Sequence, residues 1–313
     1  MGRILVTPRS VTRSGHPSLD RLRAAGHEVV LGPAGRQPSE AELLELLPAC
    51  EGYLAGVEPV SARVLAAASR LRAISRNGTG IDNVDTEAAQ ARGIALLRAE
   101  GANARGVAEL TIGFLFALAR GLPVTDARMK ERKWERANGI ELEGKTLGVV
   151  GCGRIGRLVS GMALGIGMKV IAQDLYPDAS YRPSPDFRFA PLPELLAAAD
   201  VVTLHCPPLP GHRPLIDAAA LAGMKKGVFL VNTARFDLID PAAIAAALDS
   251  GGIAALALDV FDGEPPQDWS LAAHPRVIAS PHIGGFTAES IDRAMDFAVD
   301  NLLRALAATP AAH

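Results

Sequence analysis

The chain is poor in cysteine and in aromatic residues. It contains three cysteines among 313 residues, and aromatic side chains make up 4% of the composition. Cys50, Cys152 and Cys206 are too few and too widely spaced for a disulfide framework, and they form no metal-ligand pair. The sequence therefore excludes a small disulfide-stabilised fold, predicts no metal site, and fits a reducing, cytoplasmic location.

The sequence also lacks an excess of either charge. Lys and Arg number 32 against 34 Asp and Glu, and the pI is ≈ 6.4. A nucleic-acid-binding domain is usually basic, so we expect no nucleic-acid partner. No apolar run reaches the roughly 18 residues of a membrane span, and the short run near the N-terminus favours a strand over a signal peptide. We therefore expect no membrane association.

Apolar residues make up 49% of the chain, which is enough for substantial cores. Short apolar runs alternate with longer helical patterns in two series, and this alternation predicts parallel sheets covered by helices. We therefore expect an α/β protein of two domains with a cleft between them. The strands are predicted at 3–8, 27–33, 52–56, 71–77 and 93–97, and then at 145–151, 169–174, 200–206, 227–233, 254–260 and 276–280.

Four other segments complete the pattern. Residues 104–120 are apolar nearly all round, so we expect that helix to be buried on several sides. A polar helix is expected around 125–136, and the Pro-rich segment 176–194 is expected to be a surface loop. The helix near 287–308 should return to pack on the first domain. The chain ends soon after it, so we expect no appended regulatory domain.

A glycine fingerprint opens the second series. Gly151, Gly153 and Gly156 follow a strand and begin a helix, and Asp174 ends the next strand. Three such glycines with an acid about 20 positions later are typical of a dinucleotide-binding unit, in which the pyrophosphate sits at the helix N-terminus. Asp174 would repel a 2′-phosphate, and no cation follows it closely, so we favour NAD over NADP.

Polar side chains follow three later strands. Arg235, Asp259, Glu264 and His282 each come just after a predicted strand end. Because open α/β sheets bind ligands at the carboxyl ends of their strands, we expect these side chains to meet beside a cofactor. Each has a plain alternative when taken alone, as a solvated loop charge or an ordinary loop histidine.

Together these motifs resemble the D-isomer-specific 2-hydroxyacid dehydrogenases, the family of phosphoglycerate dehydrogenase and glyoxylate/hydroxypyruvate reductase. The resemblance covers nearly the whole chain. Its motifs are SRNGTGIDNVD (75–85), GANARGVAELTIG (101–113), LEGKTLGVVGCGRIG (142–156), LHCPP (204–208), NTAR (232–235), LDVFDGEP (258–265) and PHIGG (281–285).

This resemblance implies two Rossmann-like domains. A flavodoxin-like substrate domain would hold residues 1–100 and 287–313, and an inserted dinucleotide-binding domain would hold residues 101–286. Domain closure would use hinges near Gly101 and Phe286-Thr287. The resemblance also implies a homodimer formed through the 104–120 helix.

The implied activity is hydride transfer between NAD(H) and a small 2-hydroxy or 2-keto acid. His282 would be the acid/base, Glu264 would pair with its other ring nitrogen, and Arg235 would bind the substrate carboxylate; these three form the implied catalytic set. Asn77, Gly78 and Thr79 would also bind substrate. The implied cofactor-binding residues are Val107, Gly151, Gly153, Arg154, Ile155, Gly156, Asp174, His205, Cys206, Pro207, Thr233, Ala234, Asp259, His282 and Gly284.

Within this cofactor set, Asp259 would hydrogen-bond the nicotinamide amide with help from Thr233, and His205 would line the adenosine side without a chemical role. Two other functions stay open. One is oxidation of phosphite or another small anion, since relatives share the Arg–Glu–His set. The other is a non-catalytic NAD-sensing interaction protein, like the corepressors built on this fold.

The sequence departs from the family pattern at three places. Phe236 and Asp237 replace the usual Gly-Gly, and Asp237 either pairs with Arg235 or faces solvent without consequence. Arg98 and Glu100 replace small residues, and Arg98 is a candidate cation for an unusual substrate. The loop 53–61 lacks the arginine that phosphoglycerate dehydrogenases commonly carry, so we expect that 3-phosphoglycerate is not the main substrate.

Overall fold

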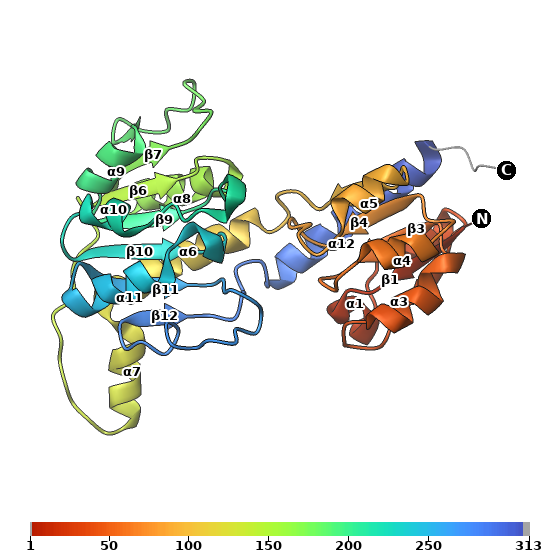
Figure 1. Cartoon of the computed structure of the whole chain (residues 1–313). Helices are drawn as coiled ribbons and strands as arrows, with labels where there is room; N and C mark the ends of the chain where they lie inside the picture. The colour runs from red at the N-terminus through yellow and green to blue at the C-terminus, as the bar shows by residue number, and fades with distance from the viewer. Residues whose placement is uncertain (1, 309–313) are drawn as a thin grey trace. The chain divides into compact units, whose positions relative to one another are not determined.

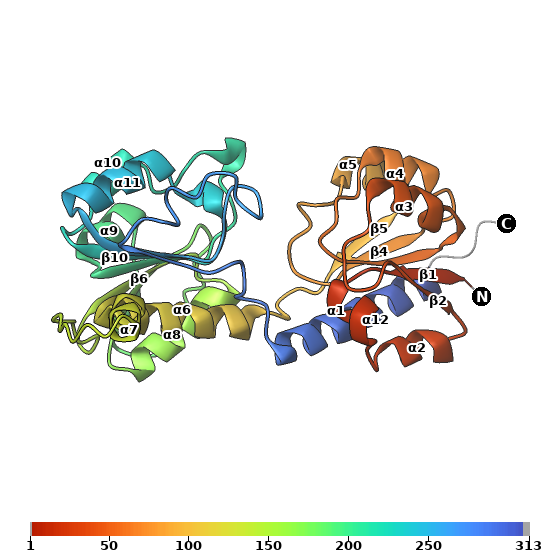
Figure 2. The ribbon, with the colours of Figure 1, turned by 90° about the horizontal axis from the view of Figure 1, so that it is seen from below.

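The computed structural model describes residues 2–308, which divide into two compact units. One unit holds residues 2–103 and 288–308, and the other holds Ala104–Thr287. Each unit consists of a sheet with helices on both faces (Figures 1 and 2). The expected substrate domain ran to residue 313, and its last five residues, 309–313, lie outside the described part.

The first unit contains a five-stranded parallel sheet in the order β2-β1-β3-β4-β5. This is the flavodoxin-like order, in which the chain changes direction across the sheet between β1 and β3. β3 and β4 are buried along their whole length, as expected of central parallel strands. The strands are β1 (Arg3–Val6), β2 (Glu28–Leu31), β3 (Gly52–Ala55), β4 (Ala73–Arg76) and β5 (Ala95–Arg98).

The helices of this unit begin where the sequence offers capping side chains. Ser39, Ser61 and Asp85 each accept a hydrogen bond from a backbone N–H in the first turn of the helix that follows. One helix, α1, was not expected, because its sequence RSVTRS has no helical apolar period. The elements are α1 (Arg9–Ser14), α2 (Leu19–Ala24), α3 (Glu40–Leu46), η1 (Leu47–Ala49), α4 (Ala62–Ala67) and α5 (Thr86–Ala91).

The last helix, α12 (Ala288–Ala308), belongs to the first unit. Its apolar stripe, which includes Met295, Val299 and Leu302, is fully buried in one cluster with Ile4 and Leu54 of the sheet. Figure 2 shows α12 on the same face of this sheet as α1 and α2. The prediction that the final helix packs back on the first strand series is therefore confirmed.

The second unit contains a seven-stranded parallel sheet in the order β12-β11-β10-β9-β6-β7-β8. This is the doubly wound order of dinucleotide-binding folds, with the switch between β6 and β9. The expected fold class of two Rossmann-like α/β domains is confirmed. The strands are β6 (Thr146–Val150), β7 (Lys169–Gln173), β8 (Phe187–Phe189), β9 (Val201–Leu204), β10 (Val228–Asn232), β11 (Ile253–Leu258) and β12 (Val277–Ala279).

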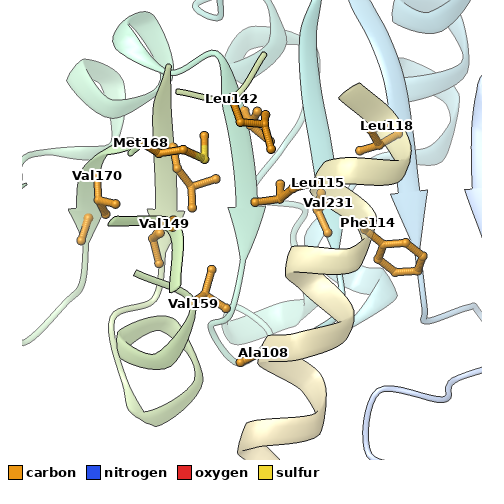
Figure 3. Close-up of a cluster of buried hydrophobic side chains, with 14 of the residues drawn as sticks. Ala108, Phe114, Leu115, Leu118, Leu142, Val149, Val159, Met168, Val170 and Val231 are labelled. Atoms are coloured by element: carbon orange, nitrogen blue, oxygen red, sulfur yellow. The ribbon is translucent and has the colours of Figure 1, made fainter. Parts of the chain in front are cut away.

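Helix α6 (Ala104–Arg120) covers one face of this sheet. Ala108, Leu115 and Leu118 point toward Val149 and Val231 on the strands (Figure 3). The expectation that α6 is buried on several sides is wrong in part. One stripe along it is exposed, because side chains three or four positions apart share a face that packs on nothing within the unit: Arg105, Glu109, Gly113, Phe116 and Arg120.

The remaining helices of the unit complete the two faces of the sheet. Figure 2 shows α8 beside α6 on one face and α9, α10 and α11 on the other. The elements are α7 (Leu122–Lys130), α8 (Arg154–Gly165), α9 (Leu192–Ala198), η2 (Pro210–His212), α10 (Ala218–Ala222), η3 (Phe236–Leu238) and α11 (Pro241–Ser250).

The segment 121–141, which we call the arm, projects from the second unit (Figure 1). Every residue of the arm is exposed, and its helix α7 ends at Lys130, earlier than the expected 125–136 helix. Among residues 2–308, no single helix has the length and apolarity to cross a membrane; α6 and α7 meet that test only together, as a pair bent by 64°.

The segment 176–194 is not a simple loop, which corrects the expectation. Residues 187–189 form β8, a short edge strand parallel to β7. Phe187 is buried and meets Tyr181 and Phe189 edge to face, with ring centroids 5.1 Å apart in each pair. The Pro-rich flanks conceal the strand in the sequence, whereas aromatic packing on β7 stabilises it.

Candidate functional site

The three fingerprint glycines lie at the switch point of the second sheet and meet different constraints. A Cβ on Gly151, which has φ +91°, would lie 2.7 Å from the backbone of His205 and Cys206. A Cβ on Gly156 would lie 2.0 Å from the carbonyl oxygen of Gly151. Gly153 has no neighbouring atom within 4 Å of such a Cβ. Two glycines are therefore required by packing, while Gly153 leaves an open surface before α8.

The N-terminus of α8 is suited to an anion. Gly153 is its N-cap residue and supplies no side-chain hydrogen bond, and the first turn carries no acid. The backbone N–H groups of Arg154 and Ile155 thus stand at the positive end of a 12-residue helix. This arrangement fits the pyrophosphate of a dinucleotide.

Asp174 follows β7 and is held by backbone donors. Its Oδ2 accepts a hydrogen bond from the Cys152 N–H at 2.7 Å, and its Oδ1 accepts one from the Tyr176 N–H at 2.9 Å. Each carboxylate oxygen keeps a further lone pair for a ribose hydroxyl. A pocket beside it has apolar walls and no cation; it is lined by Gln173, Asp174, Pro177, Phe189, Ala190 and Pro191. These residues fit an adenosine with an unphosphorylated ribose.

His205 follows β9, next to the fingerprint, and its Nδ1 atom is buried. Its Nε2 lies 2.9 Å from the Thr203 hydroxyl, and burial lowers its pKa to about 3. The ring is therefore neutral near pH 7 and cannot act as an acid there. Burial likewise raises the pKa of the neighbouring Cys206 thiol to about 11, so this thiol stays protonated.

Asp259, at the end of β11, anchors the loop that carries His282. Its side chain is almost fully buried. Its Oδ1 accepts hydrogen bonds from the Ser280 hydroxyl at 2.5 Å and the Ile283 N–H at 2.8 Å, and its Oδ2 accepts one from the Gly284 N–H at 2.7 Å. The loop after β12 is thus tied to the neighbouring strand end, a structural role that the sequence did not reveal.

His282 and Glu264 form a close pair within this anchored loop region. His282 has φ +51°, a backbone conformation that L-residues seldom adopt. Its Nδ1 lies 2.7 Å and 2.8 Å from the two carboxylate oxygens of Glu264. Among residues 2–308, Nε2 makes no hydrogen bond, so the other ring nitrogen is available to a ligand.

The pKa of His282 is raised and the pKa of Glu264 is lowered. The hydrogen bond that His282 donates to Glu264 raises the pKa of His282, and its effect exceeds the opposing effect of burial. For Glu264, burial favours a higher pKa, but the hydrogen bond with His282, the charge of His282 and a backbone hydrogen bond from Phe261 lower the pKa overall. The pair therefore favours an imidazolium facing a carboxylate.

Arg235 follows β10 and acts on both members of the pair. Its positive charge is among the causes that lower the pKa of Glu264 and that oppose the raised pKa of His282. Its Nη1 donates a hydrogen bond to the Ala234 carbonyl oxygen at 2.8 Å. Sequence reasoning placed these three side chains together, and their mutual electrostatic influence agrees with that placement.

Other expected cofactor residues lie around Asp259. The hydroxyl oxygens of Thr233 and Thr111 of α6 are 3.1 Å apart. A Cβ on Gly284 would lie 2.9 Å from Asp259 Oδ2 and 3.2 Å from Val107 Cγ2. Gly284 therefore lies between the Asp259 carboxylate and Val107, and Thr233 lies beside Thr111 of α6. Pro207 lies on the loop after β9.

Asn77, Gly78 and Thr79 lie in the first unit, directly after β4. The Asn77 N–H donates to the Ala55 carbonyl oxygen at 2.9 Å, and the Thr79 hydroxyl donates to the Asn103 side chain at 3.0 Å. The Asn77 Oδ1 is buried without a hydrogen-bond partner in residues 2–308. This loop thus presents polar groups at the carboxyl edge of the first sheet.

Phe236 and Asp237, which replace the usual Gly-Gly of the family, lie in the 3₁₀ turn η3. Neither residue has a positive φ, so glycine freedom is not needed, and Phe236 packs against the core beside β10. The Asp237 carboxylate pairs with His212, with Nδ1 and Oδ2 2.5 Å apart, and not with Arg235. Neither expectation for Asp237 described this partner, because His212 is 25 positions away in the sequence.

Arg98 ends β5 with its side chain about half exposed, and its Nη2 lies 4.0 Å from Glu100. Its suggested role as a substrate cation stays a prediction. Glu58 was not predicted as a functional residue. The sequence analysis noted only that the loop 53–61 lacks an arginine, whereas the structure shows that Glu58, an acid after β3, is buried. Its position just after a predicted strand was a signal in the sequence that could have identified it as a candidate site residue.

We expect Glu264→Gln to lower the pKa of His282, since a neutral amide replaces the charged acceptor of the hydrogen bond that raises that pKa most. The measurement is an NMR titration of the His282 ring. In the wild type its pKa lies above about 6.5, the ordinary value for histidine. Asp268→Asn, a change at an exposed acid in the same unit, should leave His282 unaffected. An identical His282 pKa in Glu264→Gln and the wild type would contradict the assignment.

Comparison with known proteins gives a family match over more than half of the chain. Residues 112–284 match the family model described as D-isomer specific 2-hydroxyacid dehydrogenase, NAD binding domain. D-3-phosphoglycerate dehydrogenase of Rattus norvegicus is 42% identical over 258 residues, which cover 82% of this chain and 48% of that protein. The chain thus spans about half the length of the curated relatives it matches.

Two solved structures are similar over nearly the whole chain. A protein from Thermus thermophilus has a TM-score of 0.87 and 36% identity, with 99% of this chain and 98% of that chain covered. A glyoxylate reductase from Paecilomyes thermophila has a TM-score of 0.86 and 27% identity, with 97% and 95% covered. The chain therefore belongs to the D-isomer specific 2-hydroxyacid dehydrogenase family, and NAD is the cofactor of its matched domain.

Proposed function

We propose that this protein reduces a small 2-keto acid to the 2-hydroxy acid with NADH, and catalyses the reverse reaction with NAD. The observation that carries the proposal is the His282–Glu264 pair under the influence of Arg235, at the ends of three neighbouring strands. Bound NADH supplies the hydride. The residues of the chain bind and orient the substrate and move the proton.

His282 is the proton donor during reduction. Glu264 accepts the Nδ1–H, so the proton for the carbonyl oxygen is held on Nε2. Glu264 is a positioning residue, which fixes the ring and stabilises its charged form. The raised pKa of His282 keeps the acid form populated near neutral pH. In the oxidative direction, the neutral ring accepts the proton of the substrate hydroxyl.

Arg235 binds the substrate carboxylate and polarises the carbonyl, because its planar guanidinium matches a carboxylate with two parallel hydrogen bonds. Asn77, Gly78 and Thr79 supply further polar groups to the substrate. The unit of residues 2–103 and 288–308 is accordingly proposed as the substrate domain, and the unit Ala104–Thr287 as the NAD-binding domain.

The geometry of the second unit supports the proposed cofactor contacts. Gly153 and the N–H groups of Arg154 and Ile155 would hold the pyrophosphate. Asp174 binds the adenosine ribose, and the cation-free pocket beside it favours NAD over NADP. Asp259 keeps a lone pair for the nicotinamide amide beyond its three loop hydrogen bonds. Val107, His205, Cys206, Pro207, Thr233, Ala234 and Gly284 complete the proposed cofactor set.

The assembly is proposed to be a homodimer formed through α6 and the arm. The exposed stripe of α6 and the arm carry exposed apolar side chains, among them Phe116, Val124, Met129 and Trp134. Exposed apolar patches of this kind mark protein interfaces. A cytoplasmic location is also proposed, supported by three unpaired cysteines.

We expect NADH to be consumed with at least one of glyoxylate, hydroxypyruvate and pyruvate, as followed by NADH absorbance. Arg235→Lys should lower kcat/KM by about 100-fold, because lysine lacks the planar fork. Arg213→Lys, a change at an exposed arginine of the same unit, should have no effect. NADH binding without turnover of any acid would favour an NAD sensor, and turnover of phosphite alone would favour small-anion oxidation.

Gly153→Ala should weaken NADH binding without unfolding the protein. The added methyl group meets no protein atom within 4 Å, but it lies where the pyrophosphate must approach. We expect the Kd for NADH, measured by fluorescence titration, to rise about tenfold, equivalent to ~1.4 kcal/mol. Gly156→Ala should instead lower the Tm by several degrees, because its methyl group clashes with backbone. Unchanged NADH affinity in Gly153→Ala would contradict the cofactor placement.

The double change Val124→Glu, Met129→Glu should convert the dimer to a monomer, because it places charges on apolar surface that the second copy covers. Sedimentation velocity gives the measurement. Leu31→Glu, at a similarly exposed apolar residue on β2, should leave the dimer intact. A wild-type protein that sediments as a monomer at micromolar concentration would contradict the proposed assembly.

A further inference from the structure

We infer that Glu58 determines substrate specificity by charge: it disfavours 2-keto acids whose far end is anionic and favours those whose far end is neutral or a hydrogen-bond donor. This inference rests on the proposed function, since it concerns the substrate of that reaction. Its basis is a buried carboxylate without an ion pair at the ligand-binding edge of the first sheet.

Glu58 lies at the switch point of the first sheet. Thr7 follows β1 directly, and Gly56 to Glu58 follow β3, the neighbouring strand in the sheet. In open α/β sheets, ligands bind outside the carboxyl ends of the strands at this point. The residues of this edge are therefore placed to contact or influence a ligand, in the way that Gly151 and His205 are in the second sheet.

One carboxylate oxygen of Glu58 accepts several hydrogen bonds, and the other accepts none within residues 2–308. Its Oε1 accepts hydrogen bonds from the Tyr53 hydroxyl at 2.5 Å, from the Gly56 N–H at 2.8 Å and from the Thr7 hydroxyl. Its Oε2 is buried and has no hydrogen-bond partner, and no ion pair of this carboxylate occurs within residues 2–308. Only about 1% of the residue surface is exposed.

Gly56 leaves the space that this carboxylate occupies. A Cβ on Gly56 would lie 2.6 Å from Glu58 Oε2 and 3.3 Å from Pro8 Cα. The carboxylate therefore fills the volume into which a side chain at residue 56 would extend. An acidic side chain, and not a cation, therefore fills this space.

The backbone of Glu58 is connected to the proposed substrate loop through Asn83. The Asn83 side chain donates to the Glu58 carbonyl oxygen at 2.7 Å and accepts from Arg76 Nε at 3.3 Å. Arg76 in turn donates to the Asn77 carbonyl oxygen at 2.7 Å. Glu58 and Asn77 thus belong to one hydrogen-bonded network at one sheet edge, and Asn77 Oδ1 is a second buried acceptor without a partner.

The balance of charge in this network favours discrimination against anions. Arg76 is the nearby cation, and its charge acts on Tyr53, but two of its guanidinium nitrogens donate to Asn83 and Asn77. A buried carboxylate is poorly screened by solvent and salt, so its field extends to a ligand at the edge. A buried charge without an ion pair is costly to keep, which a purely structural role does not explain.

The test compares kcat/KM for phosphohydroxypyruvate and hydroxypyruvate, which differ in the charge of the far end. The wild type should prefer hydroxypyruvate. In Glu58→Gln, an isosteric change that keeps the acceptor oxygen, the ratio for phosphohydroxypyruvate over hydroxypyruvate should rise roughly tenfold. Glu58→Asp, which keeps the charge, should retain the wild-type preference. Glu45→Gln, a change at an exposed acid of α3, should leave the ratio unchanged.

The outcomes separate this inference from the proposed function. Failure of the wild type to reduce any 2-keto acid would overturn the proposed function and, with it, this inference. A wild type that reduces hydroxypyruvate but uses phosphohydroxypyruvate equally well would overturn the inference alone, whether or not Glu58→Gln folds. A wild-type preference that disappears in high salt would also overturn it, because that result would assign the discrimination to exposed charges.

Discussion

The geometry of the candidate site depends on the buried carboxylate of Asp259. By accepting hydrogen bonds from Ser280, Ile283 and Gly284, it ties the loop after β12 to the end of β11. This attachment holds His282 in a positive-φ conformation, with its ring against Glu264. The interaction is strong because a charged acceptor meets several donors in an environment that excludes water.

Each of the two parallel sheets has a switch point, and each switch point carries buried polar groups. In the second unit, Gly151 and His205 meet so closely that no side chain fits between them. In the first unit, Thr7 and Glu58 meet, and Gly56 leaves the carboxylate its space. The same topology thus creates a ligand edge twice, and the local residues differentiate a nucleotide-binding edge from the edge proposed for the substrate.

Opposing effects set the protonation of the site. The hydrogen bond that His282 donates to Glu264 raises the pKa of His282, while burial and the charge of Arg235 lower it. A positive charge is needed nearby to bind a carboxylate, yet it weakens the acid form of the imidazole. Glu264 resolves this conflict, because its negative charge stabilises the imidazolium despite the nearby guanidinium. His205 has no such partner, and burial alone makes it neutral.

The sequence alone determined the fold class and the cofactor fingerprint, and it predicted that Arg235, Glu264 and His282 act together. Periodicity, glycine spacing and strand-end position are local signals, so they can be read from the sequence. It did not reveal β8, the exposed stripe of α6 or the role of Asp259 as an anchor. It also missed the Asp237–His212 pair and the buried Glu58. Only the tertiary structure decided these features, since each depends on which distant residues come into contact and on how much water remains around them.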